Sequence, residues 1–152
     1  MPLVAKKCRD LNTLKKNMDN KELFQKVKEL NFPLGQYALF GSGPMAIRGL
    51  RENRDADIIA ADELFEVCRA DTKWRTKRFD DGNEYLVFEE MELFKNWGPG
   101  EWDIGKLIKS SEIIDDLPFV NLENVLKWKK IYGREKDLKD VEIIENFLRT
   151  KL

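Results

Sequence analysis

Two carboxylates, placed two positions apart and downstream of a glycine-serine pair, could hold divalent cations beside a phosphate. The apolar segment 37–40 stops at Gly41-Ser42, and Asp55 and Asp57 open a second apolar segment. Because side chains two apart on a strand point the same way, we expect both carboxylates to lie side by side at the start of a strand. Adjacent carboxylates repel each other unless a cation lies between them, and glycine allows close approach of a phosphate. This pattern predicts metal-dependent phosphoryl chemistry.

Helices and short strands alternate along the rest of the chain. Helices are expected where apolar residues recur every three or four positions, and strands where apolar or alternating runs stand between turn residues. The expected helices cover 21–30, 45–50, 62–68, 103–109, 122–132 and 136–148, and the expected strands cover 37–40, 57–60, 74–79, 84–94, 112–114 and 118–120. This order predicts an α+β fold, with α/β-like features, in which helices flank a small mixed sheet and further helices end the chain.

The composition is that of a globular chain, because 42% of the 152 residues are hydrophobic and 36% are charged. The length fits one domain over 1–152, with a core over about 22–120 and a C-terminal helical segment over about 121–150. The 27 basic and 28 acidic residues disfavour long nucleic acid as a partner, and no segment is apolar enough for a membrane. The absence of histidine excludes Ser-His-Asp and His-zinc chemistry. Cys8 and Cys68, without a secretory signal, favour free thiols in the cytoplasm.

Two segments carry motifs that occur together in one family. Gly41-Ser42 precedes a connecting arm that leads to an Asp-x-Asp motif at 55–57, and the run 127–140 contains a Lys…Arg-x-Lys-Asp…Asp pattern. Both features resemble the nucleotidyltransferase superfamily, in which a Gly-Ser or Gly-Gly turn follows the first strand and Asp-x-Asp lies on the next. The resemblance covers about 22–148. It implies the nucleotidyltransferase fold in a minimal form, similar to antitoxin-type and DNA polymerase beta-like members.

The resemblance implies transfer of a nucleoside monophosphate from a nucleoside triphosphate to an acceptor hydroxyl, with release of pyrophosphate. Asp55, Asp57 and a third acid would hold two Mg²⁺ or Mn²⁺ ions and form the catalytic centre. By position the third acid is Glu92, with Glu90 as the alternative, since both share a face of the strand expected over 84–94. The family more often has aspartate there, so a catalytically weak or inactive, antitoxin-like module that binds nucleotide or a partner is the alternative function. A purely structural antitoxin is a third hypothesis.

Small and basic residues around the motifs are expected to bind the triphosphate. Glycine lets the backbone approach the phosphates, serine offers a hydroxyl, and arginine and lysine offer charge. Ordinary surface ion pairs are the alternative role for these cations. The expected phosphate-binding residues are Gly41, Ser42, Arg48, Arg51, Lys130 and Arg134.

The sequence does not decide between several classes of acceptor. A partner protein, as in toxin–antitoxin systems, a small molecule such as an aminoglycoside, and an RNA end are all compatible with the resemblance. The chain is short for members that carry a full second helical domain. A partner protein or a second copy of the chain could therefore complete the acceptor pocket.

Overall fold

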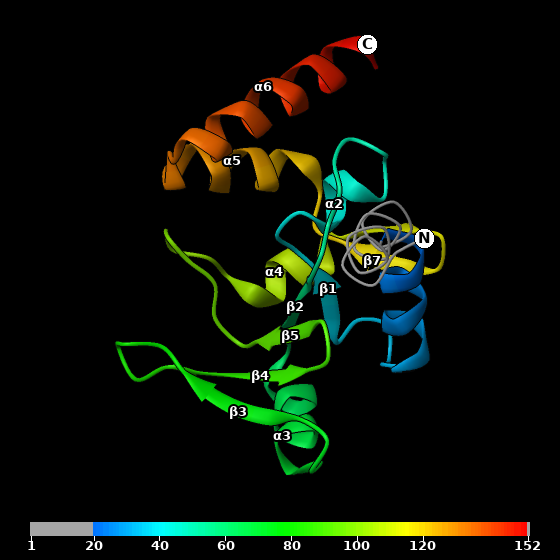
Figure 1. Ribbon diagram of the computed structural model, residues 1–152, viewed down its shortest axis with the longest axis vertical. Helices are drawn as coiled ribbons and strands as arrows, with labels where there is room; N and C mark the ends of the chain where they lie inside the picture. Colours follow the sequence, from blue (N-terminus) through cyan, green and yellow to red (C-terminus); the bar gives the residue numbers. More distant parts are fainter. Residues whose placement is uncertain (1–19, 152) are drawn as a thin grey trace, which may run out of the picture.

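A seven-stranded mixed sheet with helices on both faces forms the centre of the computed structural model, which describes residues 20–151 (Figure 1). The sheet order is β3-β4-β5-β2-β1-β7-β6. The strands are β1 (Tyr37–Leu39), β2 (Ala56–Ala60), β3 (Arg75–Arg78), β4 (Glu84–Phe88), β5 (Met91–Phe94), β6 (Glu112–Ile114) and β7 (Leu117–Phe119). The helices are a first one over 20–29, then α2 (Gly43–Ala46), α3 (Asp62–Ala70), α4 (Ile104–Lys109), α5 (Leu122–Tyr132) and α6 (Glu135–Thr150). The α+β class with a mixed sheet is therefore confirmed, whereas residues 1–19, including Cys8, lie outside the described residues.

Three central strands bring the motif residues together at one end of these strands. β1 pairs antiparallel with β2, and β2 pairs parallel with β5, so the end of β1 meets the starts of β2 and β5. The segment after β1 carries Gly41, β2 carries Asp57, and β5 carries Glu92. The register places Asp57 directly opposite Glu92. The connectivity of the sheet thus gathers residues that are far apart in the sequence.

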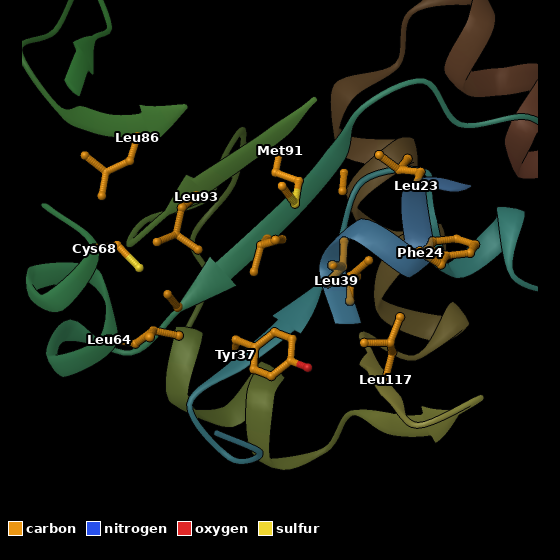
Figure 2. Close-up of a cluster of buried hydrophobic side chains, with 14 of the residues drawn as sticks. Leu23, Phe24, Tyr37, Leu39, Leu64, Cys68, Leu86, Met91, Leu93 and Leu117 are labelled. Carbon is orange, nitrogen blue, oxygen red and sulfur yellow. The ribbon is translucent and has the colours of Figure 1, made fainter. Parts of the chain in front are cut away.

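The first face of the sheet is covered by the helix over 20–29 and by α3 (Figure 2). Apolar side chains of both helices, such as Phe24 and Leu64, pack there against Leu39 and Leu93 of the central strands. All four are buried, and the free thiol of Cys68 lies in the same cluster. Burial of this apolar surface is the main term that stabilises the central strands.

The second face is covered by α4 and α5 only over its central part. Phe40, Ile59 and Val120 of the sheet region pack there against Trp128 of α5 and Ile144 of α6. Within the described residues, this second cluster contains no member from β3 or β4. The β3–β4 hairpin lies at the opposite end of the view from α5 and α6 (Figure 1). The outer strands therefore leave part of this face open.

Most expected elements are present, and α5 and β6 have the bounds that the sequence predicts. The Asn121 side chain accepts a hydrogen bond from the N–H of Asn124 at the start of α5, and Gly133 ends the helix at φ +66°. The helix expected over 45–50 begins earlier, as α2, with Pro44 in its first turn. Proline is favourable there because its missing N–H has no partner to lose.

The single strand expected over 84–94 is wrong. β4 and β5 form an antiparallel hairpin in which Phe88 pairs with Met91, and Glu89-Glu90 make the turn. Glu89 has φ +53°, a left-handed conformation that glycine or asparagine usually adopts in such turns. Neither residue occurs at this turn, so the sequence gives no sign of it. The chain reversal separates Glu90 from the strand that carries Glu92, so the two acids do not share a strand face as expected.

Candidate functional site

Asp57 and Glu92 form a pair of carboxyl groups in contact across β2 and β5. The register pairs the two residues, and residues paired in this way project to the same face of a sheet. Burial, then the charge of Glu92 and a hydrogen bond to its carboxyl group, raise the pKa of Asp57 to about 8. The charge of Asp55 raises this pKa further, and that of Lys129 lowers it. At neutral pH the pair therefore retains a proton unless a cation takes its place.

Gly41 allows the turn after β1 to approach the Asp57 carboxylate. Its φ is +61°, and a methyl group on its Cα would overlap Asp57 Oδ2 and come within 3.1 Å of Asp57 Cβ. The N–H of Phe40 donates to the backbone oxygen of Asp57 at 2.9 Å, which fixes the turn against β2. The adjacent Ser42 is partly exposed, and its hydroxyl makes no capping bond to α2. The sequence prediction that Gly41 faces the aspartates is consistent with this contact.

Asp55 and Glu90 lie beside the carboxyl pair. Asp55 directly precedes β2 and is exposed. Burial, then the charge of Glu90, raise its pKa, while the charge of Arg54 lowers it. Lys26 Nζ lies 2.5 Å from Glu90 Oε1, so Glu90 is held by a cation from the first helix. Glu92 is thus the acid that contacts Asp57, whereas Glu90 lies nearer to Asp55.

The acids fit a divalent cation in chemistry, since Mg²⁺ and Mn²⁺ prefer carboxylate oxygens. The Asp57–Glu92 pair supplies such oxygens beside Gly41, where the missing Cβ leaves the approach to Asp57 Oδ2 open. Across residues 20–151, no three carboxylate or thiol side chains are already arranged tightly enough to hold a metal ion. Asp55 is the nearby candidate for the third oxygen ligand, through its charge interaction with Asp57.

Arg48 and Arg51, expected to bind phosphate, form ion pairs in this structure. Arg48 donates to the carbonyl of Pro44 at 2.7 Å and pairs with Glu112 at 3.2 Å, with 10% of its side chain exposed. Arg51 Nη1 lies 2.5 Å from Asp140 Oδ2 of α6. Both arginines therefore tie the arm between β1 and β2 to other elements.

The two expected cations of the C-terminal run have different surroundings. Lys130 is exposed and pairs with Glu145 at 3.1 Å, on the surface of the α5–α6 pair. Arg134 is held by Asp137, with Nε 2.6 Å from Oδ2, and its guanidinium lies 3.4 Å from the centre of the Tyr132 ring. Arg134 also lines a pocket that contains Asp57. Arg134 is thus the expected basic residue that the fold brings to the acid site.

Lys129 is a buried cation that the sequence prediction missed. Its Nζ lies 2.7 Å from Asp140 Oδ2 and 3.8 Å from Asp137 Oδ1, and only 3% of the side chain is exposed. It follows the buried Val125 by four positions, so helical periodicity places it on the buried side of α5. This spacing is the sequence feature that could have distinguished Lys129 from the exposed lysines of the same segment.

We expect Lys129→Met to destabilise the fold by about 2–3 kcal/mol, because it leaves the carboxylates of Asp137 and Asp140 buried without one of their cations. Lys130→Met is the matched control on the same helix, and its exposed ion pair should contribute less than about 1 kcal/mol. Urea denaturation followed by circular dichroism measures both. Equal stability of the two variants would contradict the structural role of Lys129.

A pocket of about 490 Å³ opens beside Asp57. Its lining residues come mainly from the tip of the β3–β4 hairpin, the loop after β5 and the end of α5. Its walls include five aromatic side chains, and Trp97 of this wall stacks on Phe40 with ring centres 4.5 Å apart. The aromatic lining residues are Phe79, Phe94, Trp97, Trp128 and Tyr132. This size and lining are typical of a site for a small organic ligand.

Comparison of the chain with protein-family models, with curated proteins and with solved structures finds no match. The resemblance to nucleotidyltransferases therefore stays a prediction from the motifs. Within the part of the chain that the structure describes, no helix is both long enough and apolar enough to cross a bilayer.

Proposed function

We propose that the protein is a metal-dependent nucleotidyltransferase, which transfers a nucleoside monophosphate from a nucleoside triphosphate to an acceptor hydroxyl. The observation that supports this most is the Asp57–Glu92 pair, in register on parallel strands, with Asp57 against Gly41 and on the wall of a pocket of nucleotide size. Asp57, Glu92 and the adjacent Asp55 would hold the cations. When bound, Mg²⁺ or Mn²⁺ would neutralise phosphate charge and make the acceptor hydroxyl more acidic.

In this proposal, residues of the chain accept the proton of the acceptor hydroxyl, let the phosphates approach the backbone, and offer positive charge to the triphosphate. In the reaction the acceptor oxygen bonds to the α-phosphorus, the bond to the bridging oxygen breaks, and pyrophosphate leaves with the electron pair. Glu92 accepts the proton of the hydroxyl. Gly41 and Ser42 approach the phosphates with backbone and hydroxyl groups. Arg134, oriented by Asp137, offers charge to the triphosphate at the pocket wall.

The aromatic pocket supports a nucleotide as the donor. Planar bases stack well on aromatic side chains, and Tyr132 and Trp97 present such rings near Asp57. Because Asp57 belongs to the same lining, a base held by the rings would place its phosphates near the Asp57–Glu92 pair. Preorganised charge of this kind carries most of the catalysis in phosphoryl transfer.

The direct test is pyrophosphate release from each nucleoside triphosphate with Mg²⁺ and a cell lysate as the source of acceptor. We expect Glu92→Gln to lower the rate by about 10²- to 10³-fold, because it removes the charge next to Asp57. Glu90→Gln is the matched control, and since Glu90 is bound by Lys26 its rate should stay within a few-fold of the wild type. A reversed order of the two variants would assign the third acid to Glu90, and absence of release with every triphosphate would refute the proposed activity.

A nucleotide-binding module without turnover is the second candidate. Two observations favour it: the third acid is a glutamate, and no preformed three-acid metal group occurs within residues 20–151. Isothermal titration with ATP and Mg²⁺ separates the candidates when it is combined with the pyrophosphate assay. Binding without release would identify a module, whereas binding with release would identify an enzyme.

A further inference from the structure

The sheet register continues the row of the acid pair across the outer strands. Asp57 pairs with Glu92, Glu92 with Val87, and Val87 with Arg75. Residues paired directly across neighbouring strands project to the same face. With neighbouring strands about 4.8 Å apart, Arg75 lies roughly 14 Å from Asp57 along this row. The next row on the same face consists of Ile59, Phe94, Tyr85 and Lys77.

Arg75 and Lys77 are therefore cations on the face of the acid pair. β3 forms one edge of the sheet, and all four of its residues are exposed. Within residues 20–151, neither Arg75 nor Lys77 has an ion-pair partner, whereas the neighbouring Arg78 pairs with Glu84 at 2.9 Å. The two free charges are available to an anionic ligand on the open part of the face.

Three stacked aromatic rings lie beside these cations on the same face of the sheet. Phe79 stacks on Tyr85 with ring centres 4.5 Å apart, and Tyr85 lies 5.4 Å from Phe94 at an angle of 18°. The Phe79 residue is 46% exposed, so part of its ring is accessible to a ligand. Phe79 and Phe94 also line the pocket that contains Asp57. The stacked rings thus run from the end of β3, where Phe79 is exposed, to the pocket, where Phe94 is buried.

We propose that this acceptor shelf, made of Arg75, Lys77, Phe79, Tyr85 and Phe94, binds the single-stranded end of a nucleic acid. The proposal rests on the nucleotidyltransferase function proposed above and names its acceptor. Unpaired bases stack on aromatic rings while cations bind the phosphates, which is the usual mode of single-strand recognition. The terminal hydroxyl at the pocket would then bond to the α-phosphorus of the nucleoside triphosphate, and pyrophosphate would leave.

Two features favour this ligand over an acidic polypeptide. A polypeptide of acidic side chains would use the two cations but would leave the stacked rings without a role. The even balance of charge over the whole chain disfavours long nucleic acid, but a short single strand needs only local charge. The ligand class is therefore defined by the rings and the cations together.

Fluorescence anisotropy with labelled RNA and DNA 12-mers tests the shelf in the full-length protein. We expect Arg75→Gln combined with Lys77→Gln to weaken binding about tenfold, and to reduce the slope of log K against log salt by about 1.4, because two phosphate contacts are lost. Phe79→Ala should weaken binding by about 5- to 100-fold through lost stacking. The matched control combines Lys21→Gln with Lys109→Gln, two exposed lysines outside the shelf, and should bind like the wild type.

The inference is overturned if the wild type does not bind either 12-mer, or if the shelf and control variants bind equally. It is also overturned, in favour of an acidic polypeptide, if a glutamate 12-mer binds as tightly with the same dependence on Arg75 and Lys77. Pyrophosphate release is measured in parallel with the wild type. Release without oligonucleotide binding would refute only the shelf, whereas oligonucleotide binding without release from any triphosphate would refute the proposed enzymatic function.

Discussion

Asp57→Asn is expected to abolish pyrophosphate release and, in the metal-free protein, to stabilise the fold at pH 8. The loss of activity should be at least about 10³-fold, because the variant removes one of the charges that would hold the cations in the proposed mechanism. The gain in stability follows from the burial of the Asp57 carboxylate and from its contact with Glu92, since a neutral amide is less costly to bury and removes the repulsion within the pair. One substitution thus separates the two expected effects of the carboxylate: it destabilises the metal-free protein and, in the proposed function, takes part in the reaction.

The pH dependence of this effect has a definite sign. The folded-state pKa of Asp57, about 8, lies above the ordinary value of 3.8, so the folded protein binds more protons than the unfolded chain between these two values. The free energy of unfolding of the metal-free wild type therefore falls as pH rises from about 4 to 8. Asparagine does not titrate, so the advantage of Asp57→Asn should grow from pH 5 to pH 8, by up to about 1.4 kcal/mol for each pH unit.

Thermal unfolding in a chelator at pH 5 and pH 8 measures this difference. Mg²⁺ should then raise the midpoint of the wild type at pH 8 and leave that of Asp57→Asn nearly unchanged, because ligands stabilise only the state that binds them. Asp116→Asn is the matched control, since Asp116 lies exposed in a turn at φ +67°, a conformation that asparagine tolerates. A variant with the same pH profile as the wild type would show that Asp57 carries no unusual proton.

The sequence was sufficient where residue type and local spacing decide the structure. The Gly41 turn and the strand that carries Asp57 are local features, and their apolar flanks mark them. The contact of Glu92 with Asp57 depends instead on the pairing of β2 with β5, which local patterns do not report. The turn at Glu89 was missed because a left-handed glutamate gives no signal, and this error alone put Glu90 and Glu92 on one strand face.

The environment of charged residues is likewise difficult to predict from local sequence. Lys129 and Lys130 are neighbours of the same type in the sequence, yet one is buried between two carboxylates and the other is a surface residue. Their difference depends on how α5 packs against α6, which is a tertiary property. Arg75 and Lys77 acquired a candidate role only when the register placed them on the face of the acid pair. Residue type suggests chemistry, but the fold decides which groups meet.

The close approach of Gly41 to Asp57 leads to the second large expected effect, that of Gly41→Ala. Two costs add at this position: the left-handed backbone at φ +61°, which costs an alanine about 1–2 kcal/mol, and the overlap of the new methyl group with the Asp57 carboxylate, which costs about 1–3 kcal/mol. The carboxylate must move to relieve the overlap. Because a displacement of about 1 Å can cost 10²-fold in rate, we expect activity to fall at least that far.

Comparison with Gly49→Ala separates the cost of the methyl–carboxylate overlap from the cost of the left-handed backbone. Gly49 has φ +74°, and nothing lies within 4 Å of the position that its Cβ would occupy, so this variant pays only for the backbone. Urea denaturation and the pyrophosphate assay, applied to both variants, should show a greater loss of stability for Gly41→Ala and near-normal activity for Gly49→Ala. If the two variants are equally active, the turn does not need to approach Asp57, and the geometry on which the proposed catalysis depends is not used. If only Gly41→Ala is inactive, while it remains folded, the contact between turn and carboxylate is functional rather than merely structural.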